Sequence, residues 1–313
     1  MADDVTPIRI GTRGSKLALW QAEWVKARLE ENCPQCRAEL AVIKTRGDKI
    51  LDTPLAKIGG KGLFVKEIEE ALLDGRVDLA VHSMKDMPGE IPQGLCIGAV
   101  PVRETPYDAL ISRNHIRFDD LPEGACIGTS SLRRSSQLRH IRPDIAIAPL
   151  RGNIDTRLSK LETGEMDAVI LAAAGLTRLG FGDRITEHMD QTHMLPAVAQ
   201  GALCVEIREN DPDIQPIVDT LEHRETRIAV TGERAFLRRL EGGCQVPMAA
   251  FARLDGDRIS IDGLVADLDG SRVIKDSVAG TTDRAADLGI ELAEKLLAAG
   301  AGEILNSIIE NNE

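Results

Sequence analysis

The chain has 313 residues, of which 43% are hydrophobic, and this is enough for two or three ordinary domains, each with its own core. The formal net charge of −12 argues against general binding to nucleic acid. The start, MADDVTPIRI, runs into a strand-like segment without a basic and apolar leader, and no stretch has the length of a membrane span. We therefore expect a cytoplasmic protein with no membrane contact.

The first predicted elements are a strand over IRIGT, residues 8–12, and a helix that opens within RGSKLALWQ. Ser15 is a natural N-cap, and apolar residues including Trp20 and Trp24 recur behind it near helical spacing. Both tryptophans are expected in the core rather than in a binding site.

The six cysteines lack the spacing of a disulfide framework, and we expect reduced thiols. They are Cys33, Cys36, Cys96, Cys126, Cys204 and Cys244. Cys33 and Cys36 form a CxxC pair after the first helix, but no second pair or nearby histidine accompanies it, so a metal or redox role is disfavoured. The six histidines show no paired ligand spacing either, and no metal site is predicted.

The glycine-rich segment KIGGKGLFVKE, residues 57–67, invites comparison with a phosphate-binding loop. Walker A requires Gly-Lys followed by Ser or Thr, whereas Lys61 lies between Gly60 and Gly62 with no hydroxyl residue after it. Nucleotide binding is therefore not expected, and we interpret the segment, including Lys61, as a mobile lid.

The same order of a strand, a capping serine and a helix recurs in ACIGTSSLRRSSQL, residues 125–138. GRVDLAVHSM from Gly75 and GEMDAVILAA from Gly164 also match each other, each with a helix-stopping glycine, an aspartate and a strand. Strand-like and helix-like segments alternate up to about residue 210. The sequence thus predicts two related α/β lobes with largely parallel sheets.

A cleft between two such lobes is the expected ligand site, because ligands of open α/β sheets bind beyond the carboxyl ends of the strands. Polar residues follow the strand ends at Arg13, Ser15, Ser83, Lys85, Asp86, Thr129, Ser130, Ser131, Arg133, Arg134 and Arg151. Residues 129–161 hold six arginines and one lysine against two aspartates. Because a guanidinium matches carboxylate or phosphate geometry, we expect a small polyanion as ligand.

Asp86 is the exception, a carboxylate among these cationic candidates. It would be a salt-bridge partner of Lys85 if it served structure alone. In a cleft it would instead accept hydrogen bonds from ligand N–H groups and stabilise a developing positive charge. The residues by themselves leave both interpretations open.

The pattern changes after about residue 220, where the helical stretch RETRIAVTGERAFLRRL leads into LEGGCQVPM. Gly242 and Gly243 precede Cys244 and Pro247 follows it, so the thiol would be displayed on a defined loop. It is either a buried small hydrophobe or a thiol that carries a ligand. Short alternating segments such as RISIDGLVA and a helical tail from Asp283 predict a small third domain.

These segments resemble the porphobilinogen deaminase (hydroxymethylbilane synthase) family of tetrapyrrole biosynthesis. The resemblance spans essentially the whole chain, through GTRGSKLALWQ, TRGD, GGKGLFVKE, DLAVHSMKD, GTSSLRR, LRGN, TRL and ERAFLRRLEGGCQVPMA. Ala199 departs from the family pattern, in which glycine is expected at this turn. The resemblance implies two similar periplasmic-binding-protein-like α/β lobes with a central cleft and a smaller α+β C-terminal domain. The implied domains are residues 1–101 with 202–219, residues 107–195, and residues 224–313.

The same resemblance implies a transferase that joins four porphobilinogen molecules head to tail, with loss of ammonia, into hydroxymethylbilane for porphyrin and heme biosynthesis. A dipyrromethane primer would be bound to Cys244 through a thioether, and Asp86 would be catalytic. Positions that match cofactor-holding residues are Ser15, Ser83, Lys85, Thr129, Ser131, Arg133 and Arg134. Positions that match substrate-binding residues are Arg13, Arg151, Arg157 and Arg178. A monomer without nucleic-acid partners is implied.

Two other classes remain open. A two-lobed anion-binding module without catalysis would have similar lobes, but the missing export signal, the absence of a DNA-binding helical segment and the third domain argue against it. A cysteine hydrolase would need a histidine to activate Cys244, and no motif places one there.

Overall fold

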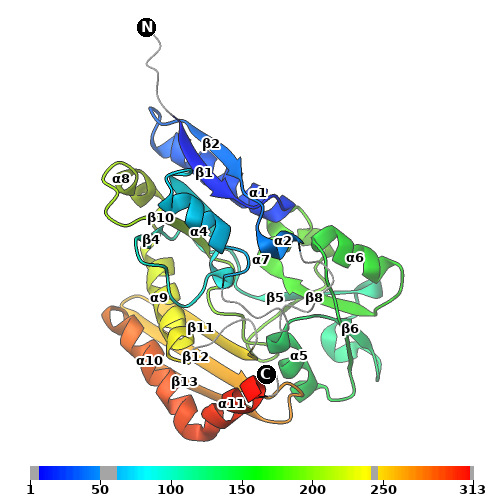
Figure 1. Cartoon of the computed structure of the whole chain (residues 1–313). Helices are drawn as coiled ribbons and strands as arrows, with labels where there is room; N and C mark the ends of the chain where they lie inside the picture. Colours follow the sequence, from blue (N-terminus) through cyan, green and yellow to red (C-terminus); the bar gives the residue numbers. More distant parts are fainter. Residues whose placement is uncertain (1–6, 50–61, 241–245, 311–313) are drawn as a thin grey trace. The chain divides into compact units, whose positions relative to one another are not determined.

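The computed structural model describes residues 7–49, 62–240 and 246–310, which fall into two compact units (Figure 1). Unit 1 comprises Met1–Asp52, Gly60–Glu104 and Ala202–Arg227, and unit 2 comprises Thr53–Gly59, Thr105–Gly201 and Ile228–Glu313. Each unit is thus built from three separate stretches of the chain. The finer division into three domains stays a prediction.

Unit 1 contains a five-stranded sheet in the order β2 (Ala38–Val42), β1 (Ile8–Thr12), β3 (Leu79–Ser83), β10 (Leu203–Arg208) and β4 (Leu95–Ala99). β1 pairs in parallel with β2 and β3, and β10 pairs antiparallel with β3 and β4. The helices assigned to this unit are α1 (Lys16–Asn32), α2 (Arg46–Lys49), α4 (Lys66–Leu73) and α8 (Gln215–Val218).

Helices α1 and α4 cover opposite faces of this sheet. Val25 of α1 belongs to one buried cluster with Val81 of β3. Ile68 of α4 belongs to another cluster with Ala80 of the same strand. Because successive side chains of a strand point to opposite faces, the sheet lies between the two helices.

Unit 2 contains a second five-stranded sheet in the order β7 (Ala146–Ala148), β6 (Cys126–Gly128), β8 (Ala168–Ala172), β5 (Asp108–Ser112) and β9 (Glu187–Met189). β6 pairs in parallel with β7 and β8, and β5 pairs antiparallel with β8 and β9. Helices α5 (Leu132–Ile141), α6 (Ile154–Glu162) and α7 (Ala173–Arg178) accompany it. Both sheets therefore share the arrangement of their first three strands and have an antiparallel strand in fourth place, and the predicted pair of related α/β lobes is confirmed.

The rest of unit 2 is a three-stranded antiparallel meander with helices. Its elements are α9 (Arg224–Arg239), β11 (Met248–Asp255), β12 (Arg258–Ala266), β13 (Val273–Thr281), α10 (Ala285–Leu296), a π-helical turn (Leu297–Ala301) and α11 (Gly302–Glu310). This confirms the predicted meander and helical tail. Gly232 of α9 approaches Gly289 of α10 so closely that a Cβ atom on Gly289 would collide with the Gly232 carbonyl oxygen.

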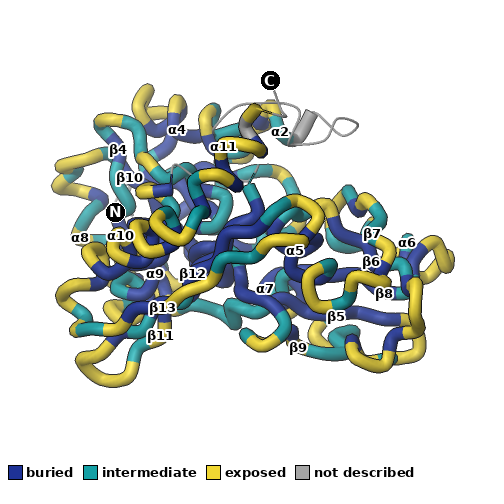
Figure 2. The backbone as a smooth tube through the Cα atoms, turned by 90° about the horizontal axis from the view of Figure 1, so that it is seen from below, coloured by how far each residue is buried: buried dark blue, intermediate teal, exposed yellow. Residues whose placement is uncertain are grey.

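Short 3-10 turns connect several elements. They are Met84–Asp86, Arg113–His115, Phe118–Asp120, Gly182–Arg184, Asp219–Leu221 and Thr282–Arg284. Burial is deepest along the inner strands, as the dark tube at β5 and β8 in Figure 2 shows, whereas β13 is largely exposed. Within the described parts of the chain, no helix is both long enough and apolar enough to cross a membrane.

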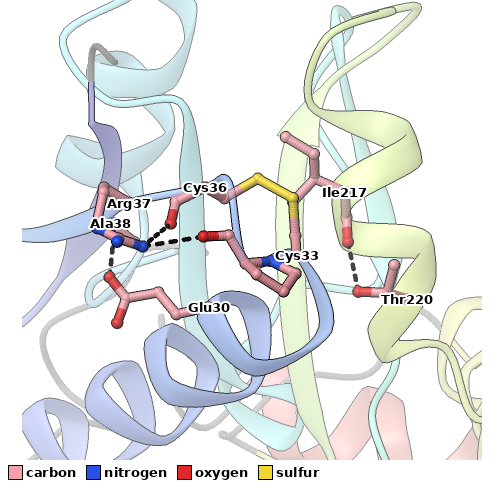
Figure 3. The surroundings of a disulfide bond; sticks show 8 residues. Glu30, Cys33, Cys36, Arg37, Ala38, Ile217 and Thr220 are labelled. Carbon is pink, nitrogen blue, oxygen red and sulfur yellow. Dashed lines mark hydrogen bonds between the residues drawn. A yellow bond between two sulfur atoms is a disulfide. The ribbon is translucent and has the colours of Figure 1, made fainter. Parts of the chain in front are cut away.

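Cys33 and Cys36 form a disulfide (Figure 3), so the prediction of reduced thiols is wrong for this pair. Cys33 ends helix α1, and the Cys36 N–H donates to the Cys33 carbonyl at 2.8 Å. This turn sets the two Cα atoms 5.4 Å apart, within the range that a disulfide spans. A single disulfide across such a turn needs no framework of further bridges, and the spacing of the cysteines does not reveal the turn. Cys96 and Cys126 are free thiols, and Cys204 is buried.

Candidate active site

A pocket opens in unit 1 at the carboxyl ends of β1 and β3. Its lining residues are Arg13, Ser15, Leu17, Ala18, Gln21, Phe64, Val65, Val81, His82, Ser83 and Asp86. Four predicted site residues, Arg13, Ser15, Ser83 and Asp86, therefore meet at one pocket. Its position beyond the strand ends is the usual place for a ligand of an open α/β sheet.

Arg13 and Ser15 come from the segment between β1 and α1. The Arg13 guanidinium lies over the Phe64 ring, 4.2 Å from its centroid, and this cation–π contact orients the planar group. Ser15 caps α1, because its Oγ accepts the Ala18 N–H at 3.3 Å. The positive end of the α1 dipole is thus directed at the pocket, where it favours anions.

Ser83 and Asp86 come from the end of β3 and the 3-10 turn that follows. The Gln21 amide donates to Ser83 Oγ at 2.9 Å, and Ser83 donates back to the Gln21 amide oxygen at 3.2 Å. Met84 is buried and its N–H donates to the Ala202 carbonyl at 3.0 Å, which anchors the turn to the chain before β10. Asp86 is half-buried at the end of this anchored turn.

Lys85 lies on the same turn and is half-buried, although it is not one of the residues that line the pocket. Gln21 and Phe64 were not predicted as site residues. Both lie in segments with an apolar or glycine-rich pattern, and only the folded structure brings them against Ser83 and Arg13.

The cationic residues Arg133 and Arg134, on α5 in unit 2, meet a carboxylate that the sequence analysis missed. Arg133 Nη1 lies 2.7 Å from Asp108 Oδ2, and Arg134 Nη2 lies 2.7 Å from Asp108 Oδ1. All three side chains are buried. One carboxylate faces two guanidiniums, so the trio keeps a net positive charge. In the sequence, this pairing is indicated by an aspartate at the start of the apolar strand DALIS, because a buried acid requires a partner.

Burial and neighbouring charges shift the pKa values of Asp108 and Arg134. Burial acts to raise the pKa of the Asp108 carboxyl, but the charges of Arg133 and Arg134 prevail and hold that pKa well below its usual range. Burial lowers the pKa of the Arg134 guanidinium. Gln200 also donates to Asp108 Oδ1, at 3.0 Å, so the trio fixes the loop that precedes β10.

Thr129 and Ser131 begin α5 in the manner of Ser15 at α1. Ser131 is the N-cap, and its Oγ accepts the Arg134 N–H at 3.4 Å. Thr129 is buried, and its Oγ1 accepts the Ser131 N–H at 3.2 Å. The order of strand, capping serine and helix that recurs in the sequence therefore forms a serine-capped helix start in both units.

The remaining predicted arginines of unit 2 are half-buried on separate segments. Arg151 lies between β7 and α6, and Arg157 on α6 donates to the Gly152 carbonyl at 2.8 Å. Arg178 ends α7 and donates to the Gly201 carbonyl at 2.8 Å. Lys61 and Cys244 lie outside the described residues. Among the described residues, no group of three or more His, Cys, Asp or Glu side chains could hold a metal ion.

The chain was compared with known families and proteins. Residues 8–216 match the family model "Porphobilinogen deaminase, dipyromethane cofactor binding domain", and residues 227–298 match "Porphobilinogen deaminase, C-terminal domain". The porphobilinogen deaminase of Geobacter metallireducens is 54% identical over 303 residues, covering 97% of this chain and 95% of that relative. That of Nitratidesulfovibrio vulgaris is 56% identical over 301 residues, covering 96% of each.

Two of the solved structures that match the chain are distant from it in sequence. A periplasmic binding protein of Salmonella typhimurium is 13% identical, with 69% of this chain and 92% of that chain covered and a TM-score of 0.40. The periplasmic VFT2 domain of Bordetella pertussis BvgS is 14% identical, with 69% and 86% covered and a TM-score of 0.39.

Proposed function

Because the chain belongs to the porphobilinogen deaminase family, we propose that the unit 1 pocket around Asp86 is where its chemistry takes place. The chain is a transferase that joins four porphobilinogen molecules head to tail, with loss of ammonia, into hydroxymethylbilane for porphyrin and heme biosynthesis. Its cofactor is dipyrromethane. The meeting of Arg13, Ser83 and Asp86 at one pocket is the observation that carries the assignment of the site.

The donors of the pocket fit a group made of acidic pyrroles. Each pyrrole unit carries acetate and propionate carboxylates and one ring N–H. Arg13, the hydroxyls of Ser15 and Ser83 and the N-terminus of α1 suit the carboxylates, and the Asp86 carboxylate suits the N–H. The bound cofactor supplies a nucleophilic pyrrole carbon. The residues proposed to hold it are Ser15, Ser83, Lys85, Thr129, Ser131, Arg133 and Arg134.

Asp86 is proposed as the catalytic residue. Its carboxylate would accept the pyrrole N–H of the substrate and stabilise the positive charge that develops as ammonia leaves. It would then take the proton released when the new carbon–carbon bond forms. The hydrogen bonds that anchor the turn at Met84 limit the movement of this carboxylate, which favours a fixed geometry for these steps.

The arginines are proposed to bind carboxylates of substrate and product. Arg13 is already oriented by Phe64, so little rotamer freedom is lost when it pairs with an anion. Arg151, Arg157 and Arg178 would bind further carboxylates as the chain lengthens. The net positive charge of the Arg133, Arg134 and Asp108 trio supports the same role.

The remaining assignments rest on the family resemblance and on composition. Cys244 would carry the cofactor through a thioether, and Lys61 would belong to a lid. The domains would be residues 1–101 with 202–219, residues 107–195, and residues 224–313. A monomeric, cytoplasmic protein without nucleic-acid partners is consistent with the net charge of −12.

The test of the site is the Asp86→Asn variant, which keeps the size of the side chain and removes its charge. We expect hydroxymethylbilane formation to fall by at least about 100-fold while the protein stays folded. Glu90→Gln, at an exposed acid four residues away, is the matched control and should keep its activity. Near-normal turnover in Asp86→Asn would remove Asp86 from its role. Intact mass, compared with a Cys244→Ala variant, tests whether an adduct of two pyrrole units depends on Cys244.

A further inference from the structure

A buried histidine and two buried glutamates lie together in unit 1, and the proposed function gives none of them a role. His82 Nε2 lies 3.0 Å from Glu206 Oε2, with side-chain exposures of 3% and 0%. His82 is on β3 and Glu206 on β10, where Ala80 and Glu206 are paired, so the two side chains share a face of the sheet. Glu69 is buried on α4, the helix that covers this face.

Two oxygens of this group are buried among the described residues without a hydrogen-bond partner, namely Oε1 of Glu69 and Oε1 of Glu206. An ionised carboxylate is costly in such a place, and two close together repel each other. Burial first, and then the charge of Glu206, raise the pKa of Glu69 to about 7, while His82 acts in the opposite direction. The group therefore retains an acid proton at a pH where an exposed glutamate has lost it.

The group reaches the pocket through His82, which is one of its lining residues and directly precedes Ser83. Glu206 orients the imidazole through its hydrogen bond with Nε2. A charge added behind His82 therefore changes the electrostatic potential where the anionic substrate carboxylates and Asp86 meet.

We propose that Glu69, Glu206 and His82 form a proton-holding cluster behind the pocket, which sets the charge presented to the substrate, with His82 as its positioning residue. This inference rests on the proposed function of the pocket. When Glu69 loses its proton, a negative charge appears in the buried layer and weakens the binding of porphobilinogen carboxylates. The Michaelis constant then rises with pH, whereas the role of Asp86 in turnover is retained.

The other titratable groups near Glu69 lie on α4 and on the sheet. Glu70 on α4 is exposed and raises the pKa of Glu69 only weakly, as the last of its causes. On the sheet, Arg9 and Arg208 pair with Asp78, at 2.7 and 3.8 Å, and these side chains belong to residues nearer the other end of the strands. Glu67 of α4 accepts the Arg46 N–H at 3.0 Å. The thiol of Cys96 on β4 has a pKa raised by burial, so it adds no charge.

The test measures KM and kcat for porphobilinogen from pH 6 to 8.5 in the full, cofactor-loaded protein and in Glu69→Gln. We expect KM of the parent to rise by roughly two- to fivefold above pH 7, as one buried charge acting across several ångströms would cause. Glu69→Gln should abolish this rise. Glu70→Gln, on the exposed side of the same helix, is the matched control and should keep it. A rise that persists unchanged in Glu69→Gln overturns the proposal.

A second measurement needs no activity and separates this inference from the proposed function. Carbon NMR titration of labelled glutamates should reveal one carboxyl that titrates near pH 7 in the parent and is absent from Glu69→Gln. If that signal is missing, the cluster does not hold its proton, even when hydroxymethylbilane is formed normally. If the signal is present but no product forms in the parent, the proposed function fails and the cluster stands. Glu206→Gln replaces Glu69→Gln if the latter does not fold, and it should lower the pH at which Glu69 titrates.

Discussion

The backbone N–H of Ala199 donates to the Glu233 carboxylate at 2.5 Å, although 34 residues separate them. The second oxygen of Glu233 accepts the Ala252 N–H at 2.9 Å, and Glu233 is fully buried. One side chain of α9 thus fastens both the loop before β10 and the strand β11.

Glu233→Gln should destabilise the protein by about 2–4 kcal/mol. The amide keeps one acceptor oxygen, but it replaces the other by a donor that meets the N–H of Ala199 or Ala252. Chemical denaturation measures the free energy of unfolding. Glu225→Gln, exposed on the same helix, is the control and should change it by less than about 0.5 kcal/mol. Equal stability of the two variants would contradict this role.

Ala199 itself has a positive φ of 56° and is completely buried. The left-handed conformation is more costly for residues with a bulky or branched side chain. Ala199→Val should therefore destabilise the protein by more than about 2 kcal/mol, whereas Ala199→Gly should stay within about 1 kcal/mol of the parent. Thermal unfolding of both variants measures the difference. An Ala199→Val variant as stable as the parent would contradict the prediction.

Asp108→Asn should be among the most damaging single changes, at about 3–5 kcal/mol, because two buried guanidiniums would lose their counter-charge. The folded pKa of Asp108 is depressed, so its contribution to stability is complete above the unfolded value and is lost as the pH falls below it. Denaturation at neutral pH and near pH 3 should show a smaller difference between parent and variant at the lower pH.

Glu69 should produce the opposite pH dependence. Its pKa is raised from 4.5 to about 7, so the folded state binds a proton that the unfolded state has released. The stability that this proton brings is present below pH 4.5 and is lost as the pH rises through 7. Glu69→Gln should remove this slope between pH 4.5 and 7 in denaturation curves, and an unchanged slope would show that Glu69 does not titrate there.

Opening the Cys33–Cys36 disulfide should cost little stability, because the bond closes a very short loop. The chain-entropy model gives about 2 kcal/mol for such a loop. Thermal unfolding of Cys36→Ser, with Cys96→Ser as the control, measures the effect. A thiol count before and after reduction checks that the bond exists.

Patterns that are local in sequence predicted the fold well. The capping serines Ser15 and Ser131, the helix stops at Gly75 and Gly164 and the alternation of RISIDGLVA each depend on neighbours a few residues away. The convergence of Arg13, Ser83 and Asp86 followed from the general rule about strand ends.

What the sequence did not reveal are pairings between distant residues. Asp108 and Arg134 are 26 residues apart, and His82 and Glu206 are 124 residues apart. A buried charge requires a partner, but its identity depends on which strands become neighbours, and that depends on the whole topology. The disulfide was missed for a different reason, since only the local turn after α1 brings its two cysteines together.

The placement of β10 has a consequence for the order in which the protein can be completed during synthesis. The sheet of unit 2 uses only residues from Asp108 to Met189, so its strands emerge from the ribosome as one uninterrupted stretch. The sheet of unit 1 begins to emerge earlier but lacks the strand that joins β3 to β4 until residue 208 is made. The five-stranded sheet whose first strand is translated first is therefore completed after the five-stranded sheet that follows it.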